Sequence, residues 1–356
     1  MNESIKVDYI IIGQGLAGSA VAIQLLKLGK KILVIDEPHK NTASTVAAGL
    51  FNPITGKKMV KTWMADILFP YLHNFYREAE LLTQESFFHP LPLYRPFVSV
   101  MEQNEWMAKS TEKAFAPYID SVLLKPSFIE VKDMFGGLLL KLCGYLDTVK
   151  YMDAVRKRIE QTDHFAQEEF NFGELILKKG SIQYKNYKAE KIIFCNGTHL
   201  NPIFGWLPVK PLKGETLTLQ ANTSSSIIIN RGVYILPMEK NQWRVGATYN
   251  FHDNEPGITE FSKNELDEKV KAISQFSYTI IGQQWGIRPT TPDRRPILGE
   301  HPEYKSVFIF NGLGTKGVSL APYFSRVLIH LTENGLPVNK EVDIERYKSV
   351  YSNSSL

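Results

Sequence analysis

Apolar and polar positions alternate in a regular order at the start of the chain. An apolar run at residues 7–12 is followed by a glycine-rich turn, and apolar positions then recur at helical spacing over residues 20–28. A second apolar run at residues 32–35 ends in two acidic residues. This change of period from strand to helix and back predicts a strand, a turn, a helix and a second strand.

The glycines of that turn and the acid after the second strand fit a bound dinucleotide. Gly13 permits a tight turn, Gly15 lets the backbone approach a pyrophosphate, and Gly18 lets the helix pack closely on the strand. The helix N-terminus attracts phosphates, and the Asp36 carboxylate can accept hydrogen bonds from a ribose diol. The segment therefore predicts dinucleotide binding, with NAD and FAD both open as the ligand.

The hydrophobic pattern changes near residue 210, where long alternating strands replace the mixed strands and helices. Such strands are predicted at residues 215–220, 227–230, 234–237 and 243–248. We therefore expect a two-domain α/β protein: a Rossmann-like nucleotide-binding domain and a substrate domain built on an antiparallel sheet. The expected limits are 1–85, 140–210 and 280–356 for the first domain, and 86–139 and 211–279 for the second.

Composition narrows the function classes. The chain has 356 residues and a net charge of +4, from 41 basic and 37 acidic residues, which is too balanced to favour an electrostatic nucleic-acid binder. Its two cysteines, Cys143 and Cys195, exclude a disulfide framework and suit a cytoplasmic protein. No apolar run approaches the ~18 residues of a membrane span, and the histidines lack metal-ligand spacing.

A second glycine-rich loop, at residues 312–317, also lies between a strand and a helix. Residues 338–343 are too polar for the buried strand that would close a second nucleotide-binding unit. We expect instead an exposed helix N-terminus whose amides and Lys316 stabilise the negative charge of a reduced flavin. The alternative is a helix end that merely packs on the first domain.

Three further segments carry candidate chemistry. Gly286, Arg288 and Pro289 fix a guanidinium on a stiffened turn, where it either captures a substrate carboxylate or holds Asp293 or a backbone carbonyl. Small residues at 43–49 allow the backbone to approach a flat group, or form a plain loop. Lys57, Lys58 and Lys61 beside Trp63 indicate an anion or nucleic-acid site, or more often a solvated face.

In this order the motifs resemble the D-amino-acid oxidase-like FAD-dependent oxidoreductases, of the glycine oxidase and sarcosine oxidase type. The resemblance covers almost the whole chain and includes Cys195-Asn196-Gly197, Pro211 with Gly214-Glu215, and residues 234–237 with 246–248. It implies FAD, held non-covalently because the cysteine before Arg288 and the histidine beside Ser44 that attach flavin in some relatives are missing. The residues that it places on FAD are Gly13, Gly15, Leu16, Ala17, Gly18, Asp36, Glu37, Ser44, Thr45, Ala48, Gly49, Leu50, Asn196, Gly197, Gly286, Gly312, Leu313, Gly314, Thr315, Lys316 and Gly317.

The resemblance also implies an activity. Arg288 falls on the arginine that typically holds a substrate carboxylate, Tyr234 falls where several members place a substrate-side tyrosine, and Lys316 completes the expected catalytic set. We expect oxidation of the C–N bond of an amine, an amino acid or an N-substituted glycine by hydride transfer to flavin N5, with O₂ or a carrier as electron acceptor. One departure is that Thr315 and Lys316 stand where glycine oxidase-like proteins carry a second arginine.

Three alternatives stay open at this point. The first is an FAD-dependent 2-hydroxy-acid dehydrogenase. The second is a tRNA-modifying oxidase of the 5-methylaminomethyl-uridine pathway, in which Lys57, Lys58 and Lys61 hold RNA. The third is a flavin-binding protein without turnover, against which the intact arginine motif argues.

Overall fold

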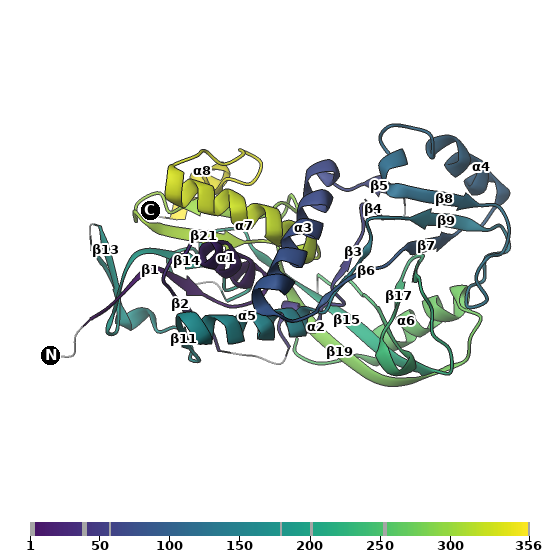
Figure 1. Cartoon of the computed structure of the whole chain (residues 1–356), viewed down its shortest axis with the longest axis horizontal. Coiled ribbons are helices and arrows are strands. Elements are labelled where there is room, and N and C mark those ends of the chain that lie inside the picture. The colour runs from purple at the N-terminus through teal and green to yellow at the C-terminus, as the bar shows by residue number, and fades with distance from the viewer. Residues whose placement is uncertain are drawn as a thin grey trace.

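The computed structural model describes residues 4–37, 41–56, 58–178, 180–199, 202–251 and 255–354. Two large sheets occupy opposite ends of the molecule, with helices α1, α3 and α7 between and above them (Figure 1). These helices span Leu16–Lys27, Ala65–Thr83 and Gly317–Asn334. The remaining helices are α2 (Ala43–Val46), α4 (Val100–Lys109), α5 (Thr148–Thr162), α6 (Glu260–Ile273), α8 (Lys348–Ser354) and the short 3₁₀ turns η1 (Ala116–Tyr118), η2 (Phe172–Glu174), η3 (Glu239–Asn241) and η4 (Ile344–Tyr347).

The first sheet is the Rossmann-like one that the sequence predicts. Its parallel strands are, in spatial order, β11 (His164–Ala166), β2 (Ile32–Ile35), β1 (Ile5–Ile12), β14 (Tyr187–Phe194) and β21 (Val307–Asn311). Three strands join antiparallel: β13 (Ser181–Tyr184), β12 (Leu175–Lys178) and β20 (Ile297–Glu300). All four residues of β2 are buried, as expected for a strand that is covered on both faces.

The register of this sheet brings the predicted nucleotide residues to one edge. Ile12 pairs with Ile35 on one side and with Phe194 on the other. Because parallel strands in register end at the same edge, the residues that follow them meet there, which is where open α/β sheets bind ligands. Helix α1 then returns from the first glycine turn and packs against α5 and α7.

The second sheet has the order β19 (Tyr278–Thr290), β15 (Lys210–Ala221), β18 (Gln242–Gly246), β17 (Tyr234–Pro237), β16 (Ile228–Asn230), β7 (Leu93–Pro96), β9 (Gly137–Leu140) and β8 (Ile119–Leu123). It is antiparallel, as expected, except for the parallel pair β16 and β7. Helix α6 packs against β15 and β18, and the fully buried Trp243 stacks on Phe276 there.

Several details differ from the pattern-based expectation. The expected limit at residue 280 falls inside β19, a strand that pairs with β15 along its length, so the division into two domains stays a prediction. The apolar pattern at residues 128–131 predicts a strand, and this prediction is wrong, since Val131 makes only an isolated bridge to Ser274. The pattern also predicts a helix over residues 101–118, but that helix ends at Lys109, and only residues 116–118 form a further, 3₁₀ turn.

Smaller sheets connect the two large ones. One consists of β3 (Leu50–Phe51), β10 (Gly144–Leu146) and β6 (Phe88–Pro90), and the other of β4 (Ile54–Thr55) and β5 (Val60–Lys61). Both small sheets are formed by chain segments that run between the nucleotide-binding edge and the second sheet. Within the residues that the structure describes, no helix has both the length and the apolar character needed to cross a membrane.

Candidate active site

A large cavity runs from the carboxyl edge of the first sheet to one face of the second. Its volume is about 1720 Å³, which exceeds the ~300–1,000 Å³ of an ordinary ligand pocket. Of the residues that the sequence places on FAD or on the substrate, all except Gly18 and Gly312 line this cavity. One continuous space can therefore hold a dinucleotide and a second molecule.

The first glycine turn packs helix α1 directly on strand β1. Gly13 has φ +91°, a left-handed conformation, and its amide donates to the carbonyl of Ile35 at 2.9 Å. A β carbon at Gly18 would lie 1.8 Å from the Gly13 carbonyl oxygen, so only glycine permits this approach. Gly18 thus acts as the sequence predicts, by close packing behind the cavity wall.

The residues at this edge fit the adenosine and pyrophosphate of FAD. Asp36 accepts the Gln14 amide at 2.9 Å through Oδ1, and its other oxygen lies 4.0 Å from Arg156 Nη2. The N-terminus of α1 opens on the cavity with Gly15 as its N-cap and no acidic residue in the first turn. Such a helix end stabilises an anion. The Ser44 hydroxyl accepts the Leu16 amide at 3.2 Å and thereby joins helix α2 to the start of α1 in the cavity wall.

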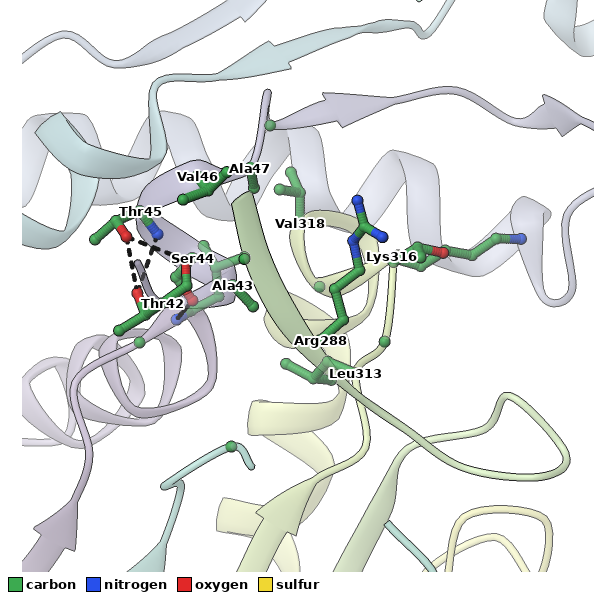
Figure 2. A pocket seen from close by; sticks show the side chains of 18 of the residues that line it. Thr42, Ala43, Ser44, Thr45, Val46, Ala47, Arg288, Leu313, Lys316 and Val318 are labelled. Carbon is green, nitrogen blue, oxygen red and sulfur yellow. Dashed lines mark hydrogen bonds between the residues drawn. The ribbon is translucent and has the colours of Figure 1, made fainter. Parts of the chain in front are cut away.

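The small-residue segment forms helix α2 and rests on β19. Thr42 caps this helix by accepting the Thr45 amide at 3.2 Å and also bridges to Ile287. Figure 2 shows α2 on one side of β19 and Arg288 on the other. This packing brings residues 43–50 and the arginine motif, which are more than 200 positions apart, to opposite sides of one passage.

The second glycine loop is tied to the other flavin-side segments by hydrogen bonds. The Asn311 side-chain amide donates to the Gly197 carbonyl at 2.7 Å, and the Gly314 amide donates to the Pro289 carbonyl at 2.8 Å. The N-terminus of α7 follows, with Lys316 as N-cap and no acidic residue in its first turn. Residues 338–343 form turns and a bridge from Asp343 to Leu298, so this loop has no closing strand of its own.

Lys316 lies in the cavity wall but extends away from Arg288 (Figure 2). Burial lowers the pKa of its ammonium, and repulsion by Arg295 and Arg294 lowers it further. An anion bound near Lys316 would stabilise the charged form of its ammonium. Its role toward a reduced flavin stays a prediction, alongside the amides of the α7 N-terminus.

Arg288 is held over a glycine at the junction of the two sheets. A β carbon at Gly214 would lie 2.0 Å from Arg288 Nη1, so the guanidinium occupies the space of the missing side chain. Nη1 donates to the Thr248 carbonyl at 3.3 Å, and the guanidinium carbon lies 5.3 Å from the Tyr249 ring centre. Burial lowers the pKa of Arg288, and Tyr249 and Tyr234 act in the opposite direction.

The alternative roles for Arg288 are now separated. Asp293 pairs with Arg346 at 3.2 Å and accepts the Arg295 amide at 3.0 Å, so the alternative that Arg288 holds Asp293 is wrong. The alternative that it holds a backbone carbonyl is met at Thr248. The contact with the Thr248 carbonyl uses one of five N–H donors. Across the described ranges, no carboxylate forms an ion pair with Arg288. Its remaining donors suit an anionic ligand.

Tyr234 lies on the same face of the second sheet as Arg288. Its hydroxyl lies over Gly246, next to Thr216 on the adjoining strand. Burial raises the pKa of this phenol, against the influence of Arg288 and Arg244. Tyr234 is therefore a neutral hydrogen-bonding group close to the predicted carboxylate site.

Sequence reasoning missed several polar residues of the cavity wall, among them Arg95, Arg156, Arg231 and Tyr249. Arg156 donates to the Gln14 side chain at 3.0 Å from helix α5, and Tyr249 lies against Arg288. Arg95 is itself buried in strand β7, all four residues of which are buried, and no pattern in the sequence indicates this. None of the four belongs to a local motif.

The lysine-rich segment has a structural role. Lys61 pairs with Asp66 at 2.6 Å, while Lys57 lies outside the described residues. Trp63 stacks on Phe324 of α7 with ring centres 5.6 Å apart, and Arg295 lies 4.0 Å above the Trp63 ring. These contacts fasten the segment to α7, so its aromatic residue is not free to stack on a nucleic-acid base.

Comparison with known proteins identifies the family of the chain. Residues 8–331 match the family described as DAO, FAD dependent oxidoreductase. The chain belongs to this family of FAD-dependent oxidoreductases, whose fold and cofactor are those predicted from the sequence.

Individual relatives are distant. The chain is 24% identical over 335 residues to a tRNA 5-methylaminomethyl-2-thiouridine biosynthesis bifunctional protein MnmC of Legionella pneumophila, covering 84% of this chain and 47% of that protein. It is 24% identical over 352 residues to a bifunctional protein ThiO/ThiG of Synechocystis, covering 91% of this chain and 51% of that protein. The chain thus spans about half the length of these curated relatives.

Solved structures show the same fold. The iminodiacetate oxidase of Chelativorans sp. BNC1 superposes with a TM-score of 0.74 at 20% identity, covering 95% of this chain and 98% of that one. The glycine oxidase of Geobacillus kaustophilus superposes with a TM-score of 0.70 at 18% identity, covering 92% and 95%.

Proposed function

We propose that this protein oxidises the C–N bond of an amino acid or N-substituted glycine, with FAD as its cofactor. The observation that carries the proposal is Arg288, a desolvated guanidinium beside the neutral Tyr234 in a cavity that also has dinucleotide-binding residues. The structural neighbours named iminodiacetate oxidase and glycine oxidase act on molecules of this class.

The chain's own residues would position both molecules. Asp36 would hold the adenosine ribose, and the N-terminus of α1 would hold the pyrophosphate. The isoalloxazine would lie between residues 48–50 and the loop that ends at Lys316. Bound FAD supplies the hydride acceptor for the reaction.

Arg288 would orient the substrate. A guanidinium binds a carboxylate through two parallel hydrogen bonds, which fixes direction as well as distance. Gly214, Thr248 and Tyr249 prevent Arg288 from moving, so the substrate is held at one angle to the flavin. The Tyr234 hydroxyl could accept or donate a hydrogen bond to the same carboxylate.

The proposal is tested by anaerobic titration of the purified holoenzyme with amino acids, N-substituted glycines, carboxylate-free amines and 2-hydroxy acids. Flavin bleaching by the first two groups is expected. Removing one partner of a buried charge pair costs about 2–5 kcal/mol, so Arg288→Met should lower kcat/KM for carboxylated amines by roughly 30-fold or more. Bleaching by 2-hydroxy acids alone would replace the proposal with the dehydrogenase alternative.

A tRNA substrate is a second candidate because MnmC proteins are among the relatives. The pairing of Lys61 with Asp66 and the packing of Trp63 weigh against it. A gel shift with bulk tRNA separates the two candidates, since a small-molecule oxidase would leave the tRNA unshifted. A cytoplasmic location, expected from the cysteine content, stays a prediction.

A further inference from the structure

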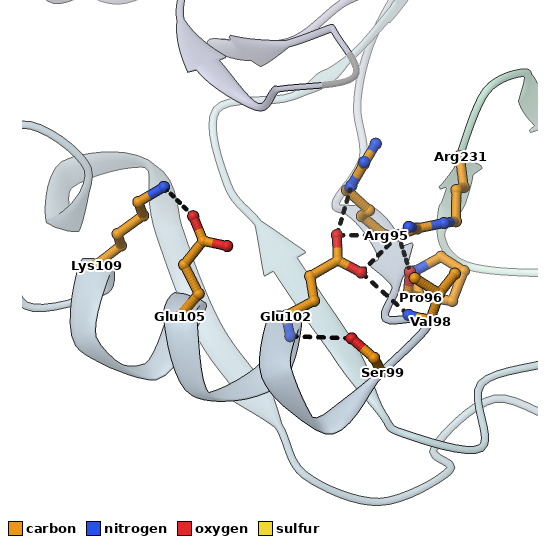
Figure 3. A network of polar contacts seen from close by, with 8 residues as sticks. All are labelled: Arg95, Pro96, Val98, Ser99, Glu102, Glu105, Lys109 and Arg231. Atoms are coloured by element: carbon orange, nitrogen blue, oxygen red, sulfur yellow. Dashed lines mark hydrogen bonds and ion pairs between the residues drawn. The ribbon is translucent and has the colours of Figure 1, made fainter.

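A second group of cations lines the same cavity on the far side of Tyr234. Arg95 lies in strand β7 and is only 7% exposed, while Arg231 lies in the turn between β16 and β17. Arg231 points its guanidinium at Glu102 of helix α4, while Arg95 faces Glu102 with its Nε, as Figure 3 shows. Arg231 Nη1 lies 3.0 Å from Glu102 Oε2, and Arg95 Nε lies 3.8 Å from Glu102 Oε1.

Glu102 is itself held in place from the other side. Its carboxylate accepts the Val98 amide at 3.0 Å, and its own amide donates to the Ser99 hydroxyl at 3.2 Å, which caps α4. Arg231 also donates to the Pro96 carbonyl at 2.7 Å. The Glu102 carboxylate and Arg231 are therefore fixed by backbone contacts as well as by each other.

The group of Arg95, Arg231 and Glu102 carries one net positive charge, from two guanidiniums and one carboxylate. Burial and the nearby Arg231 lower the pKa of Arg95, and Glu102 only partly opposes them. The two guanidiniums share one carboxylate and repel each other, and an anion bound in the cavity reduces that repulsion. A cavity wall of this kind gains free energy when an anion binds to it, and a planar guanidinium fits a carboxylate best.

The sheet register places this group in line with Arg288. Thr216 of β15 pairs with Gly246 of β18, Gly246 pairs with Tyr234 of β17, and Tyr234 pairs with Asn230 of β16. Strand β7 lies beyond β16, so Arg95 is four strand spacings from β15, or about 19 Å between backbones. The Arg288 guanidinium lies over Gly214 of β15, so this spacing is the separation of the two cationic sites at backbone level.

We propose that Arg95 and Arg231 form a subsite for a second carboxylate, so that the enzyme acts on amino acids that carry a distal acidic group. This rests on the proposed function, since Arg288 then holds the carboxylate next to the reacting C–N bond. Tyr234 lies between the two cationic sites, and the substrate extends along the sheet face from one to the other. The spacing makes the substrate longer than a simple amino acid.

The subsite is tested by binding to the holoenzyme without turnover. Unreactive α,ω-dicarboxylates of increasing chain length, each paired with the monocarboxylate of the same length, are titrated while the flavin spectrum and the unfolding temperature are recorded. Over a limited range of lengths the dicarboxylate should bind about 10- to 100-fold tighter than its partner, the effect of a charge-assisted hydrogen bond. The matching α,ω-phosphonocarboxylates show whether the subsite also takes phosphorus-based anions.

Variants of Arg95, Arg231 and Glu102 should change the affinity difference between dicarboxylates and monocarboxylates in opposite directions. Arg231→Met and Arg95→Met make the group neutral and should reduce dicarboxylate affinity to that of the monocarboxylate. Glu102→Gln raises the net charge to +2 and should strengthen dicarboxylate binding. Lys109→Met is the matched control, because Lys109 lies on the same helix, pairs with Glu105 and is absent from the cavity wall.

The outcomes are separable from those of the proposed function. Equal affinity for mono- and dicarboxylates at every length, in protein whose monocarboxylate binding Arg288→Met abolishes, would reduce Arg95 and Arg231 to a structural pair. Tight dicarboxylate binding in a protein that oxidises no amine would retain the subsite and overturn the proposed reaction. If Arg95→Met does not fold, the opposite effects of Arg231→Met and Glu102→Gln still decide.

Discussion

Gly214→Ala is a sharp test of how Arg288 is positioned, because it leaves the arginine in place. The new β carbon would lie 2.0 Å from Nη1, 2.1 Å from Nη2 and 2.3 Å from Cζ of Arg288. Favourable contacts between such atoms need about 3.5 Å or more. The backbone of β15 is extended and accepts alanine, so the strand itself need not change. The guanidinium must therefore move by roughly 1.5 Å to reach a normal contact distance.

We expect Gly214→Ala to impair substrate turnover rather than folding. The displaced guanidinium loses its hydrogen bond to Thr248, at 3.3 Å, and its position over Tyr249; these are worth about 1 kcal/mol each. Arg288 is a flexible side chain, so the sheet itself need not shift. Misplacing a substrate by about 1 Å lowers its reaction rate by roughly 100-fold, and we expect kcat/KM to fall by that factor.

The assay is the rate of anaerobic flavin reduction against substrate concentration, with Gly282→Ala as the control. Gly282 lies in the neighbouring strand β19, and its β carbon would meet Thr218 at an ordinary 3.6 Å. This variant should behave like the wild type. If Gly214→Ala reduces its flavin within threefold of the control, Arg288 does not set the substrate's orientation, and its role in the proposed function is lost.

Three further measurements address the fold and the cofactor. Burial opposes ionisation of Glu333, but hydrogen bonds from Lys30, Tyr9 and Lys191 outweigh it and lower its pKa to about 2. Glu333→Gln should therefore lower the free energy of unfolding by about 1–2 kcal/mol near pH 7, after allowance for solvent screening. Urea unfolding should show the stability difference between variant and wild type vanish as pH falls from 4.5 toward 2, because the stabilisation needs the ionised carboxylate. Acid precipitation should release all FAD into the supernatant, and yellow colour retained in the pellet would refute non-covalent binding. Because the pKa of Lys316 is lowered by folding, its charge opposes folding at neutral pH; Lys316→Met should make the apoprotein more stable near pH 7, with the gain disappearing as pH rises through the ordinary lysine range, and an unchanged thermal transition would contradict this.

The nucleotide half of the site could be predicted from the sequence because short contiguous segments build it. Gly13 needs a left-handed turn, Gly18 needs contact with a carbonyl, and Asp36 follows a buried strand; each requirement leaves a mark within a few residues. Binding of the nucleotide in this half would depend mainly on backbone amides and helix ends. Hydrophobic period and glycine spacing were sufficient to find it.

The substrate half could not be predicted in the same way. Arg95 and Arg231 come together because β7 and β16 are parallel neighbours, a pairing between segments 135 residues apart along the chain at Arg231 and Pro96. No local pattern distinguishes Arg95 from a solvated strand residue. The same holds for Asp293, which stands five residues from Arg288 yet pairs with Arg346.

This division follows from what each half binds. A cofactor with fixed chemistry is held by backbone geometry, so the glycines that permit that geometry are constrained one by one. A substrate is selected by side chains that meet across strands, and any of several strands can supply them. The line of residues from Arg288 past Tyr234 to Arg95 spans six strands of one sheet, from β19 to β7. If this line selects the substrate as proposed, we expect replacement of a single side chain along it to change the substrate while leaving the glycine turns, the sheet and the cofactor site as they are.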